Sequence, residues 1–353
     1  MKKAKLLEMT VGASVAVFLF ACGDAMEKPE PNEQSGETKN VGGKGDTFGE
    51  DRIDLLDRDG ECEEDNKKDD PDCFIRVASW NIQVFGQKKA RNDELMDRIA
   101  DKLSHFDVVA VQEINNIREK SDPGCSRNDE CPDSENCGLI RGELEEHLNE
   151  RLDRNYGFAF SDQVRHERYL YVYDKDRVEL IMDRLVDDPG DTEHPCTYRP
   201  ENTGWMVRQP HLGVFRAGDF SFTLMNAHIV PEKAYSELGA LFELQRRVEE
   251  AGFSDVIVLG DLNADCTYLS ETEQEEFYEE DYTWLFDGVD TTSQESTACT
   301  YDQVAITEPT EEDLTGDLGI ANELDPEVSD HYPVWANFYT DTDTDQHAAE
   351  VLP

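Results

Sequence analysis

Asp261 and Asn263 are two polar residues that directly follow an apolar run, residues 256–259, and Gly260. The run is typical of a strand that is buried on both faces. Because alternate residues of an extended chain point to the same side, the carboxylate and the amide would lie together. Such a pair can hold a phosphate oxygen, a water molecule or a hydrated cation. From this stretch alone, a buried strand that ends in an Asp/Asn turn explains the pattern equally well.

Polar side chains also stand at the ends of other apolar runs, so the arrangement recurs along the chain. They include two histidines, four further carboxylates and one further amide: His228, His331, Glu113, Glu167, Asp302, Asp330 and Asn81. No serine or cysteine stands in a G-x-S-x-G context. The set therefore favours metal-assisted attack by water, with an imidazole as acid or base, over covalent catalysis. Carboxylate and amide oxygens without cysteine suit Mg²⁺, Mn²⁺ or Ca²⁺ better than Zn²⁺.

Strands and helices alternate along one body, roughly residues 73–340, and must position these side chains. Apolar runs predict strands at 74–80, 107–111, 169–173, 212–215, 220–227, 256–259 and 332–338. Apolar residues that recur every three or four positions predict three helices: one with Leu95, Ile99 and Leu103 capped by Asn92 or Asp93, one with Leu144, Leu148 and Leu152, and one over 238–245. This mixture indicates a layered α/β architecture.

The first 21 residues predict an export signal. Lys2, Lys3 and Lys5 precede an uncharged stretch, residues 9–21, that is too short to span a bilayer. The stretch ends in Leu-Phe-Ala-Cys-Gly, which resembles a bacterial lipobox, so we expect lipidation of Cys22 and attachment to a membrane. Ordinary secretion is the alternative. Residues 22–72 are acidic without apolar periodicity and predict a disordered tether, and residues 341–353 predict a disordered tail.

The chain carries 80 acidic and 33 basic residues, a formal net charge of −47. This charge argues against a protein that coats nucleic acid by nonspecific attraction. It does not exclude a nuclease, because bound divalent cations and a few arginines can reverse the field at a small site. Without Cys22 the chain has eight cysteines, an even number that predicts disulfides in an exported protein. Three of them stand in residues 122–138, which predict a disulfide-stapled insertion.

Six short strings together resemble the deoxyribonuclease I family of the endonuclease/exonuclease/phosphatase superfamily. The strings are WNIQVFG at 80–86, QE at 112–113, ERYL at 167–170, GDLNADC at 260–266, CTYD at 299–302 and SDHYP at 329–333. The resemblance covers about residues 74–339. It implies a four-layer α/β sandwich, in which two packed mixed sheets are flanked by helices, with an active site at one edge.

The resemblance also implies where the metal ions bind. Glu113, helped by Asn81 and Asp330, would hold a catalytic Mg²⁺ or Mn²⁺. A structural Ca²⁺ is a further expectation, because the Asp/Thr-rich calcium loop of the family is approximately matched at residues 290–297. One extra residue before Cys299 makes that match imperfect, so the calcium site is the weaker of the two expectations.

Catalytic roles follow from the same resemblance. His228 would pair with Asp302, and His331 would pair with Glu167. One imidazole would activate the attacking water while the other protonates the leaving 3′ oxygen. The two residues expected to orient the phosphate are Asp261 and Asn263.

Substrate contacts and a disulfide complete the expected site. Arg208 matches a phosphate-contacting arginine of the family, and Arg165 and Arg168 are candidates for a small cationic rim around the cleft. Arg165 stands where the family has a tyrosine that enters the DNA minor groove, so we expect altered minor-groove contact. Cys266 and Cys299 flank two segments that the family fold brings side by side, so we expect a disulfide between them.

These expectations define a function and its competitors. The first is an exported or lipid-anchored, metal-dependent endonuclease that hydrolyses DNA to 5′-phosphate products, acting as a monomer without a protein partner. The alternative within the superfamily is a phosphodiesterase that acts on a phospholipid such as sphingomyelin, because the catalytic core would be shared. A third hypothesis, a non-catalytic adhesin on the same fold, is disfavoured by the presence of both histidines and all the metal-type carboxylates.

Overall fold

The computed structural model describes residues 39–40, 62, 70–115, 135–186, 205–253, 255–278, 282–293 and 298–341. All of these belong to one compact unit that begins at Gly36. The export signal, Cys22, the tail from residue 342 and most of the insertion at 122–138 lie outside the described residues. Those assignments therefore stay predictions.

The strands among the described residues form two mixed sheets. One sheet has seven strands, in the order β1 (Lys39–Asn40), β12 (Leu314–Ile320), β13 (Val334–Tyr339), β2 (Phe74–Phe85), β3 (Val108–Asn115), β5 (Glu167–Asp174) and β4 (Tyr156–Phe160). The other has six, in the order β10 (Tyr282–Trp284), β11 (Asp302–Thr307), β9 (Val256–Asp261), β8 (Phe220–His228), β7 (His211–Ala217) and β6 (Glu179–Leu185). Each sheet has a parallel pair near its centre, β2 with β3 and β8 with β9.

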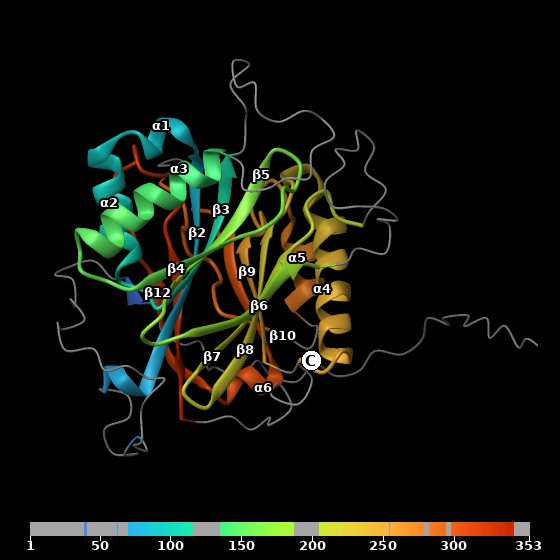
Figure 1. Ribbon diagram of the computed structural model, residues 1–353. Helices are drawn as coiled ribbons and strands as arrows, with labels where there is room; N and C mark the ends of the chain where they lie inside the picture. The colour runs from blue at the N-terminus through green and yellow to red at the C-terminus, as the bar shows by residue number, and fades with distance from the viewer. Residues whose placement is uncertain are drawn as a thin grey trace, which may run out of the picture. The chain divides into compact units, whose positions relative to one another are not determined.

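Helices cover the outer faces of the two sheets (Figure 1). One side carries α1 (Gln87–Ala90), α2 (Asp93–Leu103), α3 (Glu135–Leu144) and a π-helical turn, η3 (Glu145–Glu150). The other side carries α4 (Ala234–Glu250) and α5 (Glu271–Tyr278). Three short helices lie in connections: η2 (Pro71–Cys73), η4 (Pro231–Lys233) and α6 (Glu308–Glu311). The order helices, sheet, sheet, helices confirms the predicted four-layer α/β sandwich.

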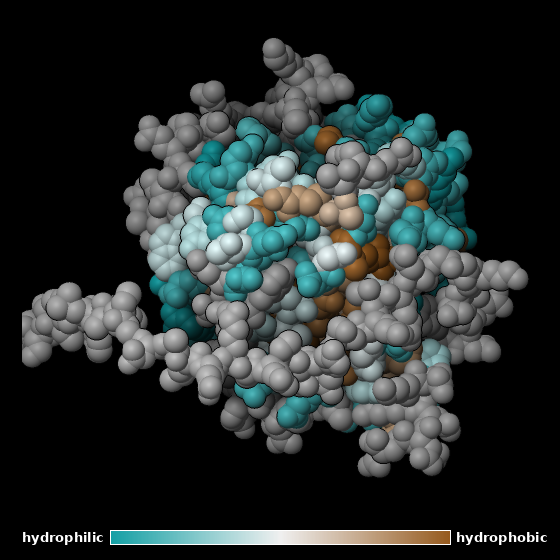
Figure 2. All heavy atoms as spheres, turned by 180° about the vertical axis from the view of Figure 1, so that it is seen from behind, coloured by the Kyte–Doolittle hydropathy of each residue, from teal (hydrophilic) through white to brown (hydrophobic). Residues whose placement is uncertain are grey.

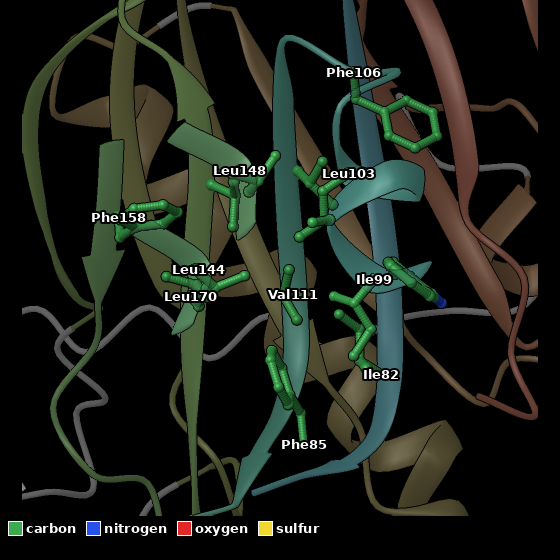
Figure 3. Packing of buried hydrophobic residues seen from close by; sticks show 14 of the residues in the cluster. Ile82, Phe85, Ile99, Leu103, Phe106, Val111, Leu144, Leu148, Phe158 and Leu170 are labelled. Atoms are coloured by element: carbon green, nitrogen blue, oxygen red, sulfur yellow. The ribbon is translucent and has the colours of Figure 1, made fainter. Parts of the chain in front are cut away.

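Three groups of buried apolar side chains hold the layers together. Between the sheets, Ile257 of β9 and Val108 of β3 belong to one cluster. Outside the seven-stranded sheet, Leu103 of α2 and Leu148 of η3 belong to a second cluster with Val111 of β3 (Figure 3). The third cluster joins α4 to the six-stranded sheet. All six residues of β9 are buried, which confirms the prediction of a strand covered on both faces.

The helix predicted around Leu144, Leu148 and Leu152 ends earlier than expected. The α-helix stops at Leu144, and the π-helical turn η3 follows. Because a π-helix has hydrogen bonds from residue i to i+5, it rotates later residues away from the α-helical stripe. Leu148 is still buried, but Leu152 lies beyond the turn and is 40% exposed. By contrast, α2 begins as predicted, with the Asn92 side chain accepting a hydrogen bond from the Leu95 backbone N–H.

Part of the predicted tether is attached to the body. Residues 39–40 form β1, which pairs in parallel with β12. Cys62 is disulfide-bonded to Cys73, which immediately precedes β2. A uniformly detached segment over 22–72 is therefore wrong at these two places. The predicted bond between Cys266 and Cys299 is confirmed, with the two Cα atoms 5.8 Å apart.

One face of the molecule shows how polar and apolar residues are distributed over the described surface. On the face opposite that of Figure 1, most described residues are hydrophilic, and apolar residues gather in a narrow strip (Figure 2). Within the part of the chain that the structure describes, no helix combines the length and apolar character needed to cross a bilayer.

Candidate active site

The predicted site residues come together where strands of both sheets end. Asn81, Glu113 and Glu167 stand on β2, β3 and β5 of the seven-stranded sheet. His228 ends β8, Asp261 ends β9 and Asp302 begins β11, and the strand register places these three residues side by side. Asp330 and His331 lie in the segment just before β13, which begins at Val334. The parallel pairs explain this convergence, because the carboxyl ends of parallel strands meet at one edge of a sheet.

Gly260 allows β8 and β9 to lie this close at the site. Its backbone has φ +148°, and a Cβ atom added there would lie 1.8 Å from the Ala227 carbonyl oxygen. Only glycine avoids that collision. The glycine before Asp261 is therefore required for the close approach of the β9 backbone to the β8 backbone.

Asn81 connects the two sheets at the centre of the site. Its Nδ2 donates to Glu113 Oε1 at 3.0 Å and to Asp261 Oδ2 at 3.0 Å. Behind it, the buried Gln112 Nε2 donates to Asn226 Oδ1 at 2.7 Å, again from one sheet to the other. Buried amide bonds of this kind fix the relative position of the sheets, because a lost partner would leave a desolvated polar group.

The two histidines pair with carboxylates in the opposite way to the expectation. His228 Nδ1 lies 2.9 Å from Glu167 Oε1, and His331 Nδ1 lies 2.7 Å from Asp302 Oδ2. The expected pairs, His228 with Asp302 and His331 with Glu167, are wrong. The Tyr169 hydroxyl on β5 accepts a hydrogen bond from the His228 backbone N–H, which holds the end of β8 beside Glu167.

A bridge between Thr292 and His331 explains the second pair. The two residues pair as an isolated antiparallel bridge. The neighbouring Thr291 Oγ1 accepts a hydrogen bond from the Asp302 backbone N–H at 3.1 Å. The segment 291–292 therefore brings the start of β11 to His331.

Asp261 lies between the two imidazoles. Its Oδ2 is 3.5 Å from His228 Nε2 and 3.8 Å from His331 Nε2. Three carboxylates and two imidazoles thus alternate along a row. Because each Nδ1 contacts a flanking carboxylate, each Nε2 faces the shared central space. The geometry suits two imidazoles that exchange protons with one bound group.

The row of carboxylates raises the pKa of both histidines. Burial lowers the pKa of His331, but Asp302 and Asp261 outweigh it and raise that pKa to about 10. Burial also opposes protonation of His228, but Glu167 and Asp261 raise its pKa above the usual value, while Arg208 opposes them. Burial raises the pKa of Asp302 to about 6, against the attraction of His331. The attraction between His331 and Asp302 favours the charged form of both groups.

Backbone strain concentrates at the site. Val84, Glu113 and Asn263 are non-glycine residues with φ of 52°, 60° and 48°. Such conformations cost about 1–3 kcal/mol each and cluster at functional sites. At Glu113 the strain accompanies two contacts: Oε1 accepts from Asn81, and Oε2 accepts from the Val84 backbone N–H at 2.8 Å. The folded protein therefore holds this carboxylate in one orientation.

Several oxygens at the site fit a hard divalent cation. Asn81 Oδ1 and Asp330 Oδ1 are buried and have no hydrogen-bond partner. Gln83 Nε2 donates to the other Asp330 oxygen at 2.8 Å and so orients that carboxylate. Carboxylate and amide oxygens are the ligands that Mg²⁺ and Mn²⁺ prefer. Glu113, Asn81 and Asp330 are therefore suited to the expected metal.

A second group of potential ligands at the site is less suited to hold a metal. Asp261, Asp302 and His331 have candidate ligand atoms within 4.8 Å of one another. However, Asp302 is one of the three candidate ligands and is already engaged by His331 Nδ1 at 2.7 Å, and His331 Nε2 lies in the catalytic row, 3.8 Å from Asp261 Oδ2. This arrangement is that of an oriented acid–base group, as described above.

The three predicted arginines occupy different environments. Arg208 Nε lies 2.6 Å from Glu167 Oε1, and its Nη1 donates to the His228 carbonyl oxygen at 3.0 Å. Arg165 is half-buried, and its Nε donates to a carbonyl oxygen at 3.4 Å. Arg168 is buried and donates to the Ser161 carbonyl oxygen, so its place in an exposed rim is wrong. Along β5 the side chains alternate, so Arg168 points away from the face that carries Glu167.

Asn263 lies beside the end of β8 but is already hydrogen-bonded. Its Nδ2 donates to the Ile229 carbonyl oxygen at 3.0 Å, and the residue is only 5% exposed. The bond fixes the loop after β9 next to the residue that follows His228. Orientation of a phosphate by Asn263 stays a prediction.

Sequence reasoning missed residues that hold the candidate metal ligands in place. Lys89 Nζ donates to the carbonyl oxygens of Ile82, Gln83 and Val328, which ties α1 to both sides of the site. Burial lowers the pKa of Lys89 to about 8. Ser329 Oγ donates to the Asn81 carbonyl oxygen at 2.6 Å. Of these two residues, only Ser329 could have been identified from the sequence, by its place in the Ser-Asp-His string.

Comparisons with known proteins agree with this site. Residues 78–331 match the family model described as the endonuclease/exonuclease/phosphatase family. The chain is 27% identical over 282 residues to deoxyribonuclease-1 of Oryctolagus cuniculus, covering 74% of this chain and 91% of the relative. It is 27% identical over 283 residues to deoxyribonuclease-1 of Homo sapiens, covering 74% and 90%.

Among solved structures, an endonuclease/exonuclease/phosphatase of Bacteroides vulgatus is 18% identical, with a TM-score of 0.49 over 75% of this chain and 98% of that one. The family match spans well over half of the chain and includes residues from Asn81 to His331. The chain therefore belongs to the endonuclease/exonuclease/phosphatase family, as a phosphodiester hydrolase that is distantly similar to deoxyribonuclease-1.

Proposed function

We propose that the protein is a metal-dependent endonuclease that hydrolyses DNA phosphodiester bonds to 5′-phosphate products. The observation that carries this proposal is the row in which two imidazoles face one carboxylate, beside partnerless oxygens that suit a divalent cation. The relatives that cover most of the chain are named deoxyribonuclease-1, which supports DNA as the substrate.

Glu113, Asn81 and Asp330 are proposed to hold Mg²⁺ or Mn²⁺. When bound, the cation would supply charge stabilisation to the phosphoryl oxygens. Asn81 and Gln83 orient the two carboxylates through hydrogen bonds. A structural Ca²⁺ at residues 290–297 stays a prediction, since residues 294–297 lie outside the described part of the chain.

His228 and His331 are proposed to move the protons. One Nε2 takes a proton from water as the water oxygen bonds to phosphorus, and the other gives a proton to the leaving 3′ oxygen as its bond to phosphorus breaks. Glu167 and Asp302 hold the rings through Nδ1 and stabilise their charged forms. Arg208 is proposed to contact a phosphate, and its contacts with Glu167 and with the His228 carbonyl oxygen support this by holding it beside the histidine.

A substrate panel tests the assignment. Purified chain would be incubated with supercoiled plasmid, RNA and sphingomyelin vesicles, each with Mg²⁺ or with chelator. We expect Mg²⁺-dependent plasmid nicking with ends that a ligase can seal directly, because such ends carry 5′-phosphate and 3′-hydroxyl groups. Hydrolysis of sphingomyelin without cleavage of DNA would overturn the assignment in favour of a phospholipid phosphodiesterase.

Export of the protein is part of the proposal. The signal-like first 21 residues, the Cys62–Cys73 and Cys266–Cys299 disulfides and the similarity to deoxyribonuclease-1 all support it. We propose that a lipid on Cys22 anchors a monomer to a membrane. Incorporation of labelled palmitate into the wild type but not into Cys22→Ser would support the anchor. Equal labelling of both chains, or none of either, would refute it.

A further inference from the structure

A second cluster of titratable side chains lies on the outer helices, away from the residues of the active site. Asp93 begins α2, and Glu146 and His147 stand in η3. Candidate ligand atoms of these three residues all lie within 4.8 Å of one another. Glu143, one helical turn before His147, also faces the same imidazole. None of these residues contributes to the catalytic row.

His147 is the unusual member of this cluster. Its side chain is completely buried, and its Nδ1 lies 2.7 Å from Asp97 Oδ1. Its Nε2 is buried without any hydrogen-bond partner. When a carboxylate accepts a hydrogen bond from Nδ1–H, the neutral ring presents a lone pair at Nε2, which is the arrangement of metal-bound histidines.

The distances around Nε2 favour a metal ion over a proton. Asp93 Oδ1 lies 3.5 Å away and Glu143 Oε2 lies 3.6 Å away. A charged imidazole–carboxylate hydrogen bond would be about 2.7–2.9 Å long. In a tetrahedral site with metal–ligand bonds of about 2.1 Å, neighbouring ligand atoms are about 3.4 Å apart. The observed separations match the edge of such a tetrahedron.

The negative charge of the cluster also favours the binding of a cation. Four carboxylates, those of Asp93, Asp97, Glu143 and Glu146, surround the imidazole. Arg151 contacts three of them, at 2.6 Å from Asp93, 2.8 Å from Asp97 and 2.6 Å from Glu146. One guanidinium leaves an excess of negative charge. Each carboxylate offers about four lone-pair sites, so contact with Arg151 leaves room for a metal.

We propose that Asp93, Glu146 and His147, with Glu143 as a fourth ligand, bind a divalent transition-metal ion such as Zn²⁺. Imidazole with carboxylates suits this class of ion, whereas the oxygen-only catalytic site suits Mg²⁺. The ion links α2 to η3 on the outer face of the seven-stranded sheet. This proposal does not depend on the substrate of the enzyme.

Zinc binding to the full chain tests the site. After removal of metals, Zn²⁺ binding would be measured by calorimetry and by elemental analysis for the wild type, His147→Gln and Asp93→Asn. The matched control is Glu94→Gln, which removes an exposed carboxylate one residue further along α2. We expect the wild type and the control to bind one more Zn²⁺ per chain than His147→Gln. Zn²⁺ bound at the catalytic site cancels in this comparison.

Asp93→Asn is the second variant, in case His147→Gln does not fold. The Asp93 side chain is 73% exposed, so its substitution should leave the fold intact. We expect at least a tenfold rise in Kd for Asp93→Asn. Diffraction at the zinc edge should give an anomalous peak beside His147 Nε2. Equal zinc stoichiometry and affinity in all four chains, or no peak at His147, would overturn the proposal.

Discussion

The two histidine–carboxylate pairs of the active site share one geometry but have different neighbours. In both, Nδ1 contacts the carboxylate at 2.7–2.9 Å. The Asp302 side chain is fully buried, and its Oδ1 has no hydrogen-bond partner. Glu167, in contrast, shares the oxygen that contacts His228 with the guanidinium of Arg208.

This difference shows how one fold gives two imidazoles unequal proton affinities. A buried carboxylate without a competing cation stabilises the imidazolium strongly, and the pKa of His331 is raised to about 10. At His228, burial and the nearby Arg208 guanidinium oppose protonation, but Glu167 and Asp261 raise the pKa above its usual value. Arg208 beside Glu167 and the deeper burial of Asp302 are the features that distinguish the two pairs.

Removal of the divalent cation should have the largest effect on activity, because neither histidine–carboxylate pair can then act on a correctly held phosphate. Without the cation to hold and polarise the phosphate, plasmid nicking should fall by about 10³-fold or more. Glu113→Gln should reproduce this loss at saturating Mg²⁺, whereas the exposed Glu232→Gln should not. Full nicking after exhaustive chelation would show that the imidazoles act without a metal.

Loss of either imidazole should be the next largest effect. His228→Ala and His331→Ala should each lower kcat by about 10²-fold, the usual size of a general acid or base contribution. The double variant should lose less than the product of the two, because the residues act as a unit. His105→Ala, at the end of α2, is the matched control. Activity within tenfold of wild type would remove that histidine from the mechanism.

Substitution of the carboxylate partner should lower kcat to a different extent in the two pairs. Asp302→Asn should lower kcat roughly tenfold more than Glu167→Gln, because it removes the main charge that stabilises a buried imidazolium. Steady-state kinetics on one DNA substrate, with thermal unfolding as a check on folding, measures this ratio. Equal losses would mean that the difference in burial has no catalytic consequence.

The smallest expected effects are shifts of the His228 pKa, which should be opposite in sign for two substitutions. Arg208→Gln should raise the pKa of His228, and Glu167→Gln should lower it, since these neighbours act in opposite directions. NMR of the imidazole ring measures both shifts. The raised pKa also means that the imidazolium stabilises the fold at acid pH and that this contribution is lost as the pH rises through the folded pKa. Shifts of the same sign in both variants would contradict the comparison.

Much of the fold could be predicted from the sequence, because its central elements have strong patterns. The run that became β9 is apolar at every position, and Leu95, Ile99 and Leu103 recur at helical spacing in α2. Two strands at or beside a sheet edge, β6 and β12, were missed for the opposite reason. In β6 no residue is fully buried, and β12 contains a glycine and an aspartate at its centre, so neither has a clear alternation.

The site residues could be predicted, but not how they pair. Short strings identify His228, His331, Glu167 and Asp302, because the chemistry is local to each strand end. The pairing depends on which strands are neighbours in space. Only the order β11–β9–β8 and the docking of β5 against β8 determine that Asp302 faces His331 and Glu167 faces His228. The burial of Arg168 is likewise set by the face of β5 that packs under the helices, which it shares with Leu170 and Val172.

The hydrogen bond from Gln112 to Asn226 has a consequence for how activity appears during folding. It joins two sheets whose strands are themselves assembled from distant parts of the chain, such as β2 with β13. Contacts this far apart in sequence form slowly, because loop closure must precede them. A refolding chain should therefore regain its helices before any nuclease activity, and the return of cleavage should report the final docking of one sheet on the other.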